Sequence, residues 1–206
     1  MNAYTVHKWT KEIPNLNGKA FSPETEPFCS LPYAQIKLYP WDESGYRPEA
    51  RAYVACNDDG LIVLMCAKEE TTISAETKFG GAVCRDSCLE FFFNPRPSQQ
   101  EEYINIEANC AGIMHIGFGS GRENRRVLTE MPHGLTIGHS KHTGAWWAVC
   151  YFLPYGLTDE FEREFRGNFY TCDETLHEHY GTWNPVIADH PDFHRPECFG
   201  SLYLED

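Results

Sequence analysis

The chain has 206 residues, a formal net charge of −13 at pH 7 and an aromatic content of 14%. This length suits one domain over residues 1–206, with enough aromatic side chains to fill the core of a β-sandwich. The negative charge excludes nucleic acids and anionic membrane surfaces as partners, because both repel an acidic protein. The charge favours a neutral or cationic partner, and neutral sugars are one such class.

The N-terminus, Met1 to Trp9, contains no apolar run of signal-peptide length. A transmembrane helix needs about 20 apolar residues in succession, and the chain has no such stretch. The sequence as printed therefore predicts a cytoplasmic protein. Nine cysteines, an odd number without a Cys-x-x-Cys pair, predict buried free thiols rather than a disulfide framework.

Short segments rich in β-branched and aromatic residues, separated by turn residues, occur along most of the chain. They predict strands at 51–56, 61–67, 89–93, 103–109, 113–118, 135–139 and 146–153, and a last strand at 199–204. Their spacing predicts an all-β protein, an antiparallel β-sandwich of the immunoglobulin-like or jelly-roll type.

Turn residues link several of these segments. Asn57-Asp58-Asp59-Gly60 is a strong hairpin signal, because Asp-Gly tolerates the positive φ angles of tight hairpin turns. The residues 109–112 and His142-Thr143-Gly144 predict further turns.

One segment has the signals of a short helix. Thr158 or Asp159 can cap its N-terminus, Phe161 and Phe165 share a helical face, and Gly167 ends it. We therefore expect one short helix, followed by a long irregular stretch from residue 170 to the last strand.

The segment 103–109 alternates between apolar and polar residues, so Tyr103, Asn105, Glu107 and Asn109 face one way. Carboxylates and amides can engage adjacent sugar hydroxyls, and an aromatic ring can cover the apolar face of a sugar. The row therefore favours a sugar-binding surface, although a row of this kind also suits a sheet face in contact with water.

Glu90 lies between bulky apolar residues in the middle of a predicted central strand. Burial of an unpaired carboxylate raises its pKa or costs several kcal/mol. Glu90 therefore either pairs with an arginine, for which Arg122, Arg125 and Arg126 are candidates, or points into a polar cleft.

The segment Asp86-Ser87-Cys88-Leu89-Glu90-Phe91-Phe92 resembles the Asp-Ser strand of the carbohydrate-binding modules of family 9. The segments 58–63, 167–170, 179–185 and 191–200 resemble the same family in the same order, in particular its stand-alone branch. The resemblance extends from about Phe28 to the C-terminus, and it implies a β-sandwich related to DOMON domains.

In that family two tryptophans sandwich a sugar ring, carboxylates and amides hold its hydroxyls, and calcium ions support loops. By resemblance the strand glutamate falls on Glu90 and one tryptophan on Trp183, although a Trp in such a loop can also cap the core. The other tryptophan falls near Cys84, and a thiol supplies no aromatic wall. Three residues could replace that wall: Phe79, Tyr46 and Trp41.

The first hypothesis is therefore a non-catalytic domain that binds a mono- or oligosaccharide and is linked to carbohydrate catabolism. Its predicted binding residues are Glu90, Tyr103, Asn105, Glu107, Arg125 and Trp183. We expect no catalytic residues, no nucleic acid or membrane partner, and calcium only by resemblance. A protein partner is left open.

Two alternatives come from the same residues. In the first, Glu90 and Glu107 are the paired carboxylates of a glycoside hydrolase. In the second, the protein binds a metal or haem through the His-rich C-terminal segment, because related DOMON-type sandwiches can hold haem or sugar. Its candidate ligands are His177, His179, His190, His194, Asp173, Glu178, Asp189 and Asp192. These histidines could equally be hydrogen-bonded loop residues.

Overall fold

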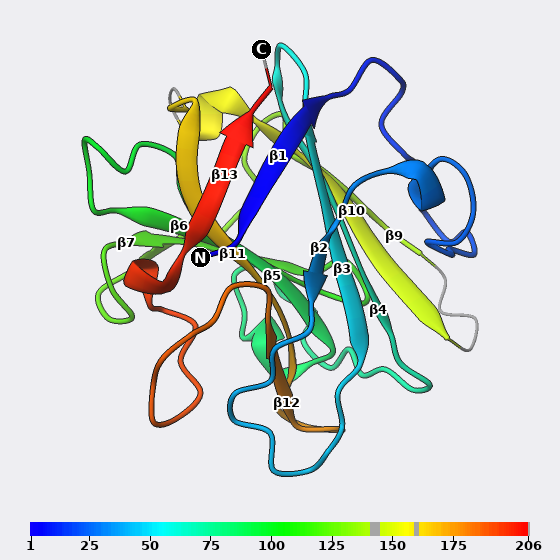
Figure 1. The fold of residues 1–206 in the computed structure, drawn as a ribbon. Helices are drawn as coiled ribbons and strands as arrows, with labels where there is room; N and C mark the ends of the chain where they lie inside the picture. The colour runs from blue at the N-terminus through cyan, green and yellow to red at the C-terminus, as the bar shows by residue number, and fades with distance from the viewer. Residues whose placement is uncertain (141–144, 159–160, 206) are drawn as a thin grey trace.

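The structure, a computed structural model, describes residues 1–140, 145–158 and 161–205. The predicted turn at 142–144 and the predicted helix cap Asp159 lie outside the described residues. Within them the chain is all-β, as predicted, and forms two sheets that one shared strand connects (Figure 1). No helix in the described ranges is both long and apolar enough to cross a membrane.

The first sheet consists of β1 (Ala3–Lys8), β5 (Cys88–Asn94), β6 (Tyr103–Asn109), β7 (Met114–Gly119), β8 (Arg126–Val127), β11 (Glu164–Asp173), β12 (His179–Thr182) and β13 (Gly200–Leu204). Their order is β8-β7-β6-β5-β11-β13-β1, and β12 pairs with β11. The second sheet consists of β2 (Ala34–Ile36), β3 (Glu49–Cys56), β4 (Gly60–Lys68), β9 (Thr136–His139) and β10 (Trp146–Pro154). Its order is β1-β3-β4-β10-β9, with β2 beside β3.

Strand β1 connects the two sheets. It pairs in parallel with β13 through residues 3–6 and in parallel with β3 through residues 7–8. The other strand pairs among the described residues are antiparallel, which agrees with the predicted sandwich. Four short 3-10 turns complete the described elements: Phe28–Ser30, Val83–Arg85, Tyr155–Leu157 and Pro196–Cys198.

The main core lies between the sheets, because strand residues two apart face the same side. Phe91 and Phe93 of β5 stack with a centroid distance of 4.6 Å, and Phe91 stacks on Phe169 of β11 at 4.7 Å. Trp147 of β10 is in the same core, whereas its neighbour Trp146 belongs to a second cluster on the opposite face of that sheet.

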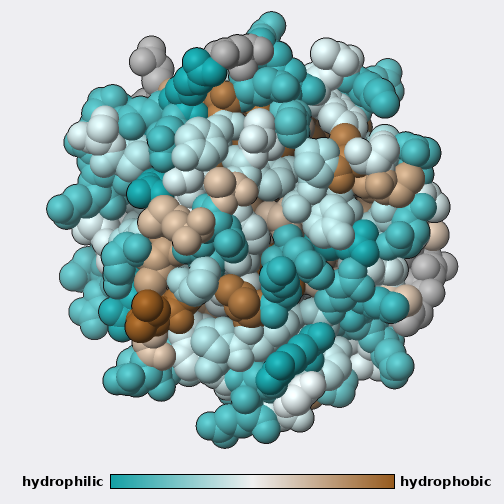
Figure 2. Space-filling view, viewed as in Figure 1, coloured by the Kyte–Doolittle hydropathy of each residue, from teal (hydrophilic) through white to brown (hydrophobic). Residues whose placement is uncertain are grey.

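The outer face of the first sheet is also buried. The chain after β12 crosses this face, and its Val186, Phe193 and Phe199 pack with Phe92 and Tyr170 in a third cluster. The central strands β5 and β6 are therefore covered on both faces, and polar groups on their outer face are withdrawn from water. On the face of the molecule in Figure 2, hydrophilic side chains predominate and hydrophobic atoms form only small separate groups.

The predicted strands are confirmed, and β6 has the predicted bounds. The predicted hairpin at 57–60 is also confirmed: the side chain of Asn57 accepts hydrogen bonds from the backbone N–H groups of Asp59 and Gly60, both at 3.0 Å. Glycine is needed at position 60 for a reason other than the expected positive φ. A Cβ there would lie 2.2 Å from the carbonyl oxygen of Leu153 on β10.

The predicted short helix is wrong. Tyr155–Leu157 is a 3-10 turn, and β11 begins at Glu164. Phe161 and Phe165 are four residues apart, a spacing that puts them on one face of a helix but also on one face of a strand. Pairing of β11 with β13 places Phe165 in the strand, whereas Phe161 precedes β11 and its ring packs on those of Phe93 and Phe165. The expected irregular stretch after residue 170 likewise contains the end of β11 and the whole of β12.

All nine cysteines are free thiols. Five are buried: Cys56, Cys66, Cys88, Cys150 and Cys172. Cys29 is exposed, and the remaining three are partly exposed.

Candidate functional site

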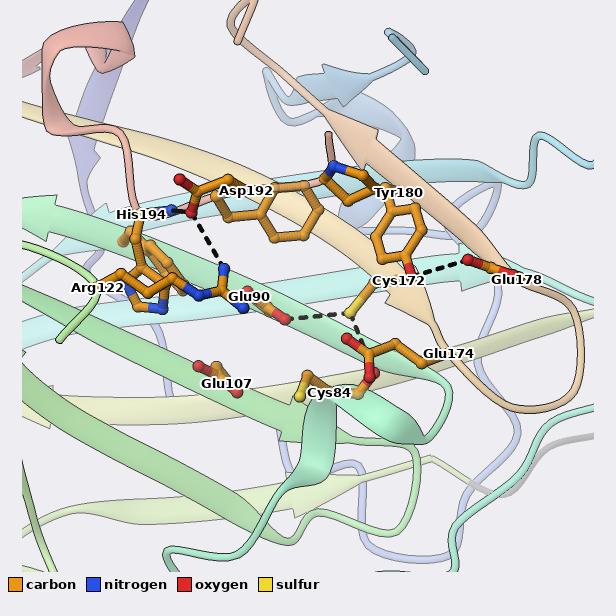
Figure 3. A pocket seen from close by; sticks show the side chains of 13 residues that line it. Cys84, Glu90, Glu107, Arg122, Cys172, Glu174, Glu178, Tyr180, Asp192 and His194 are labelled. Atoms are coloured by element: carbon orange, nitrogen blue, oxygen red, sulfur yellow. Dashed lines mark hydrogen bonds and ion pairs between the residues drawn. The ribbon is translucent and has the colours of Figure 1, made fainter. Parts of the chain in front are cut away.

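A cavity of about 320 Å³ lies over the outer face of the first sheet (Figure 3). Its floor comes from Glu90 of β5, Glu107 of β6 and Cys172 of β11. The segment 191–194 closes one side, and Tyr180 of β12 closes another.

Glu90 and Glu107 are directly opposite one another on neighbouring antiparallel strands, so their side chains meet on the same face of the sheet. They are 2% and 7% exposed. The Oε1 atom of Glu90 accepts a hydrogen bond from the Sγ atom of Cys172 at 3.1 Å, and the Oε1 atom of Glu107 accepts one from Nδ2 of Asn105 at 2.8 Å.

This arrangement changes the acid strength of both carboxyl groups. Burial, and then the neighbouring charge of Glu107, raise the pKa of Glu90 well above its ordinary value. Burial also raises the pKa of Glu107, against the lowering effects of His115 and Asn105. A pair of this kind tends to retain a proton, so it can donate a hydrogen bond as well as accept one.

Arg125 lies behind the cavity floor and does not line the cavity. Its Nε atom donates to Oδ1 of Asn105 at 2.9 Å, and its guanidinium lies 4.3 Å from the ring centre of Tyr103. Its remaining nitrogens donate to the carbonyl oxygens of Gly119, Gly121, Tyr103 and Gly117. Arg125 therefore orients Asn105, which in turn orients Glu107.

Tyr103 supports the cavity wall from behind. Its hydroxyl is 2.8 Å from Nδ1 of His194, and the imidazole of His194 packs 5.0 Å from the ring of Phe92. Burial, followed by the charges of Arg125 and Arg122, lowers the pKa of His194 to about 4. The imidazole is thus neutral at pH 7.

The structure does not bring Trp183 together with the other predicted binding residues. Its side chain is 6% exposed and belongs to the main core between the sheets, where it packs edge-on against Phe169 at 5.4 Å. The predicted stacking role is corrected accordingly: β12 ends at Thr182, and the next side chain turns inward to the core. A Cβ on Gly200 would lie only 2.5 Å from its ring, so glycine at that position makes room for the indole.

Aromatic walls nevertheless surround the cavity. Phe92, Tyr180, Phe193 and His194 line it, and the rings of Tyr180 and Phe193 meet edge-on at 6.3 Å. Cys84 also lines the cavity, so the position where the family has its second tryptophan does face this space.

Of the three expected replacements for the missing wall, Trp41 alone lies nearby. It packs against Tyr180 and Phe193 from outside the cavity, at 6.4 and 6.0 Å. Phe79 packs on the main core, and Tyr46 lies beside His177. Sequence reasoning did not identify Tyr180 and Phe193 as wall residues, although both lie in segments that resemble the family.

Charged groups form the rim. The Nη1 atom of Arg122 is 3.1 Å from Oδ1 of Asp192, and the Nε atom of Arg195 is 2.8 Å from the other oxygen of Asp192. The hydroxyl of Tyr180 donates to Glu178 at 3.1 Å. Arg122, one of the candidate partners of Glu90, therefore pairs with a rim aspartate at the cavity mouth.

The histidine-based metal site is not formed. Nδ1 of His179 is 2.7 Å from the carbonyl oxygen of His177, and His194 contacts Tyr103. Within the described ranges, the one group of at least three close potential metal ligands contains Cys88, Glu90 and Cys172 and no histidine.

The fold and cavity define a structural class: a β-sandwich with a concave, aromatic-walled cavity on one sheet face. The sequence profile of carbohydrate-binding family 9 matches residues 21–204, which is most of the chain. The chain therefore belongs to carbohydrate-binding family 9.

Solved structures share this fold. A Bacteroides uniformis protein proposed to bind carbohydrate has 23% identity and a TM-score of 0.82, and the match covers 98% of this chain and 99% of that one. A family 9 module from Caldicellulosiruptor kristjanssonii in complex with cellotriose has 9% identity and a TM-score of 0.65, over 99% of this chain and 94% of the module. A family 9 module from the same organism with glucose has 10% identity and a TM-score of 0.65, over 99% and 96%. Among curated proteins, no relative matches the chain.

Proposed function

We propose that this protein is a non-catalytic carbohydrate-binding domain whose cavity takes one sugar unit at a time. The observation that carries the proposal is the meeting of two buried carboxyl groups, Glu90 and Glu107, with aromatic walls in one cavity. Membership of carbohydrate-binding family 9 supports the ligand class. The structurally similar modules with glucose and cellotriose make glucose-based sugars the first candidates.

The chemistry of the cavity suits a neutral sugar. Phe92, Tyr180 and Phe193 offer apolar surface to the C–H groups of a pyranose ring. Carboxyl groups that hold a proton can donate to one hydroxyl and accept from the next. The volume of about 320 Å³ lies at the lower end of small-molecule sites, which favours a single ring inside the cavity over a longer buried chain.

The hydrolase alternative has weaker geometric support. Glu90 and Glu107 are cross-strand neighbours on one floor, so a sugar in the cavity meets both carboxyl groups from the same side. Paired glycosidase carboxyl groups act instead from two sides of the bond that breaks. Hydrolysis of an aryl glycoside that disappears in both Glu90→Gln and Glu107→Gln would favour the enzyme over the binding domain.

The proposal is tested by calorimetric titration of the protein with glucose, cellobiose and cellotriose. We expect saturable binding of at least one sugar, a loss of at least about tenfold in affinity in Glu107→Gln, and a smaller loss in Tyr180→Ala. The matched control is Glu69→Gln, which alters a buried carboxyl group just after β4 that accepts a hydrogen bond from Nε1 of Trp147 and does not line the cavity. Equal sugar affinities in Glu107→Gln and Glu69→Gln, or no binding across a wider sugar panel, would contradict the proposal.

A cytoplasmic location and a link to carbohydrate catabolism stay predictions. A calcium requirement also stays a prediction. Repeating the sugar titration after removal of calcium with a chelator checks it.

A further inference from the structure

A cluster of two thiols and one carboxyl group lies beneath the cavity. Cys88 and Glu90 are two residues apart on β5, so both point to the outer face of the first sheet. Cys172 on β11 is directly opposite Cys88. The Sγ atoms of the two cysteines and a carboxyl oxygen of Glu90 all lie within 4.8 Å of one another.

The spacing of these atoms suits one tetrahedral metal ion. Zinc lies about 2.3 Å from thiolate sulfur and about 2.0–2.2 Å from carboxylate oxygen, so ligand atoms around it are separated by roughly 3.5–4 Å. The distance from Sγ of Cys172 to Oε1 of Glu90 is 3.1 Å, and the other separations do not exceed 4.8 Å. Small side-chain rotations therefore suffice to close the three groups around an ion.

The donor set and the surroundings identify the chemical class of the ion. Two sulfur ligands favour zinc and other soft or borderline divalent ions and disfavour calcium, which takes oxygen ligands. All three side chains are buried, on strands held by antiparallel pairing, so the site is rigid. Among the described residues, five carboxyl groups and one arginine, Arg122, line the cavity, so acidic groups remain in excess even when Glu90 and Glu107 share a proton, and this excess attracts a cation.

We propose that Cys88, Glu90 and Cys172 bind one zinc-like divalent ion at the base of the cavity. Glu90 and Cys172 line the cavity, so an ion can enter from there. Three protein ligands leave a fourth position open, which faces the same space. The proposal shares Glu90 with the sugar site, but it concerns a different ligand and its test contains no sugar.

The test uses cobalt(II), because tetrahedral cobalt bound to thiolates has intense visible and near-ultraviolet absorption bands. The reduced, metal-free full chain carries the substitution Cys29→Ser, since Cys29 is exposed and could bind the probe by itself. We expect thiolate-to-cobalt bands that saturate at one ion per chain and disappear when zinc is added.

Variants locate the ligands. Cys172→Ser and Cys88→Ser should lose most of the band intensity, whereas Cys150→Ser, a buried thiol of the second sheet, should keep it. Glu90→Gln should weaken cobalt binding at least about tenfold and retain the sulfur bands. Circular dichroism checks that each variant is folded, and if Cys88→Ser is not, Cys172→Ser and Glu90→Gln decide. An absence of thiolate bands in the folded reduced protein, or undiminished bands in Cys172→Ser, would overturn the proposal.

Discussion

Replacement of His194 by glutamine should remove a defined part of the pH dependence of stability. The pKa of this imidazole is about 4 in the folded protein against an ordinary value of 6.5, chiefly because of burial and then the charges of Arg125 and Arg122. A lowered pKa means that the folded state binds the proton more weakly than the unfolded chain. The stability contributed by the neutral form is therefore fully present above pH 6.5 and is lost as pH falls from 6.5 to about 4.

The two pKa values correspond to a loss of at most about 3 kcal/mol across that window. Urea unfolding, followed by tryptophan fluorescence, measures the free energy of unfolding of both proteins at pH 7 and at about pH 4. The wild type should lose more stability than His194→Gln, and the difference should approach the calculated loss. The interpretation fails if the two proteins differ by the same amount at both pH values.

Three further predictions concern other parts of the structure. Burial raises the pKa of Glu69 from 4.5 to about 7. The protonated carboxyl group therefore contributes stability below pH 4.5, and this contribution is lost as pH rises to about 7. In urea unfolding, the free energy of unfolding of Glu69→Gln should rise by up to about 3 kcal/mol relative to that of the wild type over this range. Arg125→Lys should lower the free energy of unfolding by at least about 2 kcal/mol, because lysine cannot donate hydrogen bonds to Asn105 and to all four carbonyl oxygens. An unchanged urea denaturation midpoint would contradict this. Trp183→Phe should lower the free energy of unfolding by about 1–3 kcal/mol, because the indole is in the core. Calorimetry should show an unchanged sugar affinity. A large loss of affinity in a folded variant would restore the predicted role of Trp183 in the site.

Much of the sheet structure could be predicted because local pattern and local structure agree. Strand β6 alternates between apolar and polar residues, and the turn at 109–112 ends it, so its bounds follow from the sequence. That Glu90 and Glu107 face one another could be inferred as well, because they lie on consecutive antiparallel strands.

The errors occur where distant contacts decide. The spacing of Phe161 and Phe165 fits a helix and a strand equally well, and the pairing of β11, which starts at Glu164, decides against the helix. Trp183 looks like a binding residue in a Pro-bounded loop, but packing against Phe169 and Gly200 places it in the core. The cavity walls formed by Tyr180 and Phe193 arise when the chain after β12 crosses the first sheet, and no local pattern predicts that path.

A crystal structure of the protein soaked with glucose or cellotriose tests the central claim most directly. We predict electron density for a sugar ring in the cavity, with its hydroxyls within hydrogen-bond distance of Glu90 and Glu107 and its C–H face against Tyr180 or Phe193. A sugar bound at another surface, with this cavity holding only water at saturating concentration, would contradict the assignment of the site.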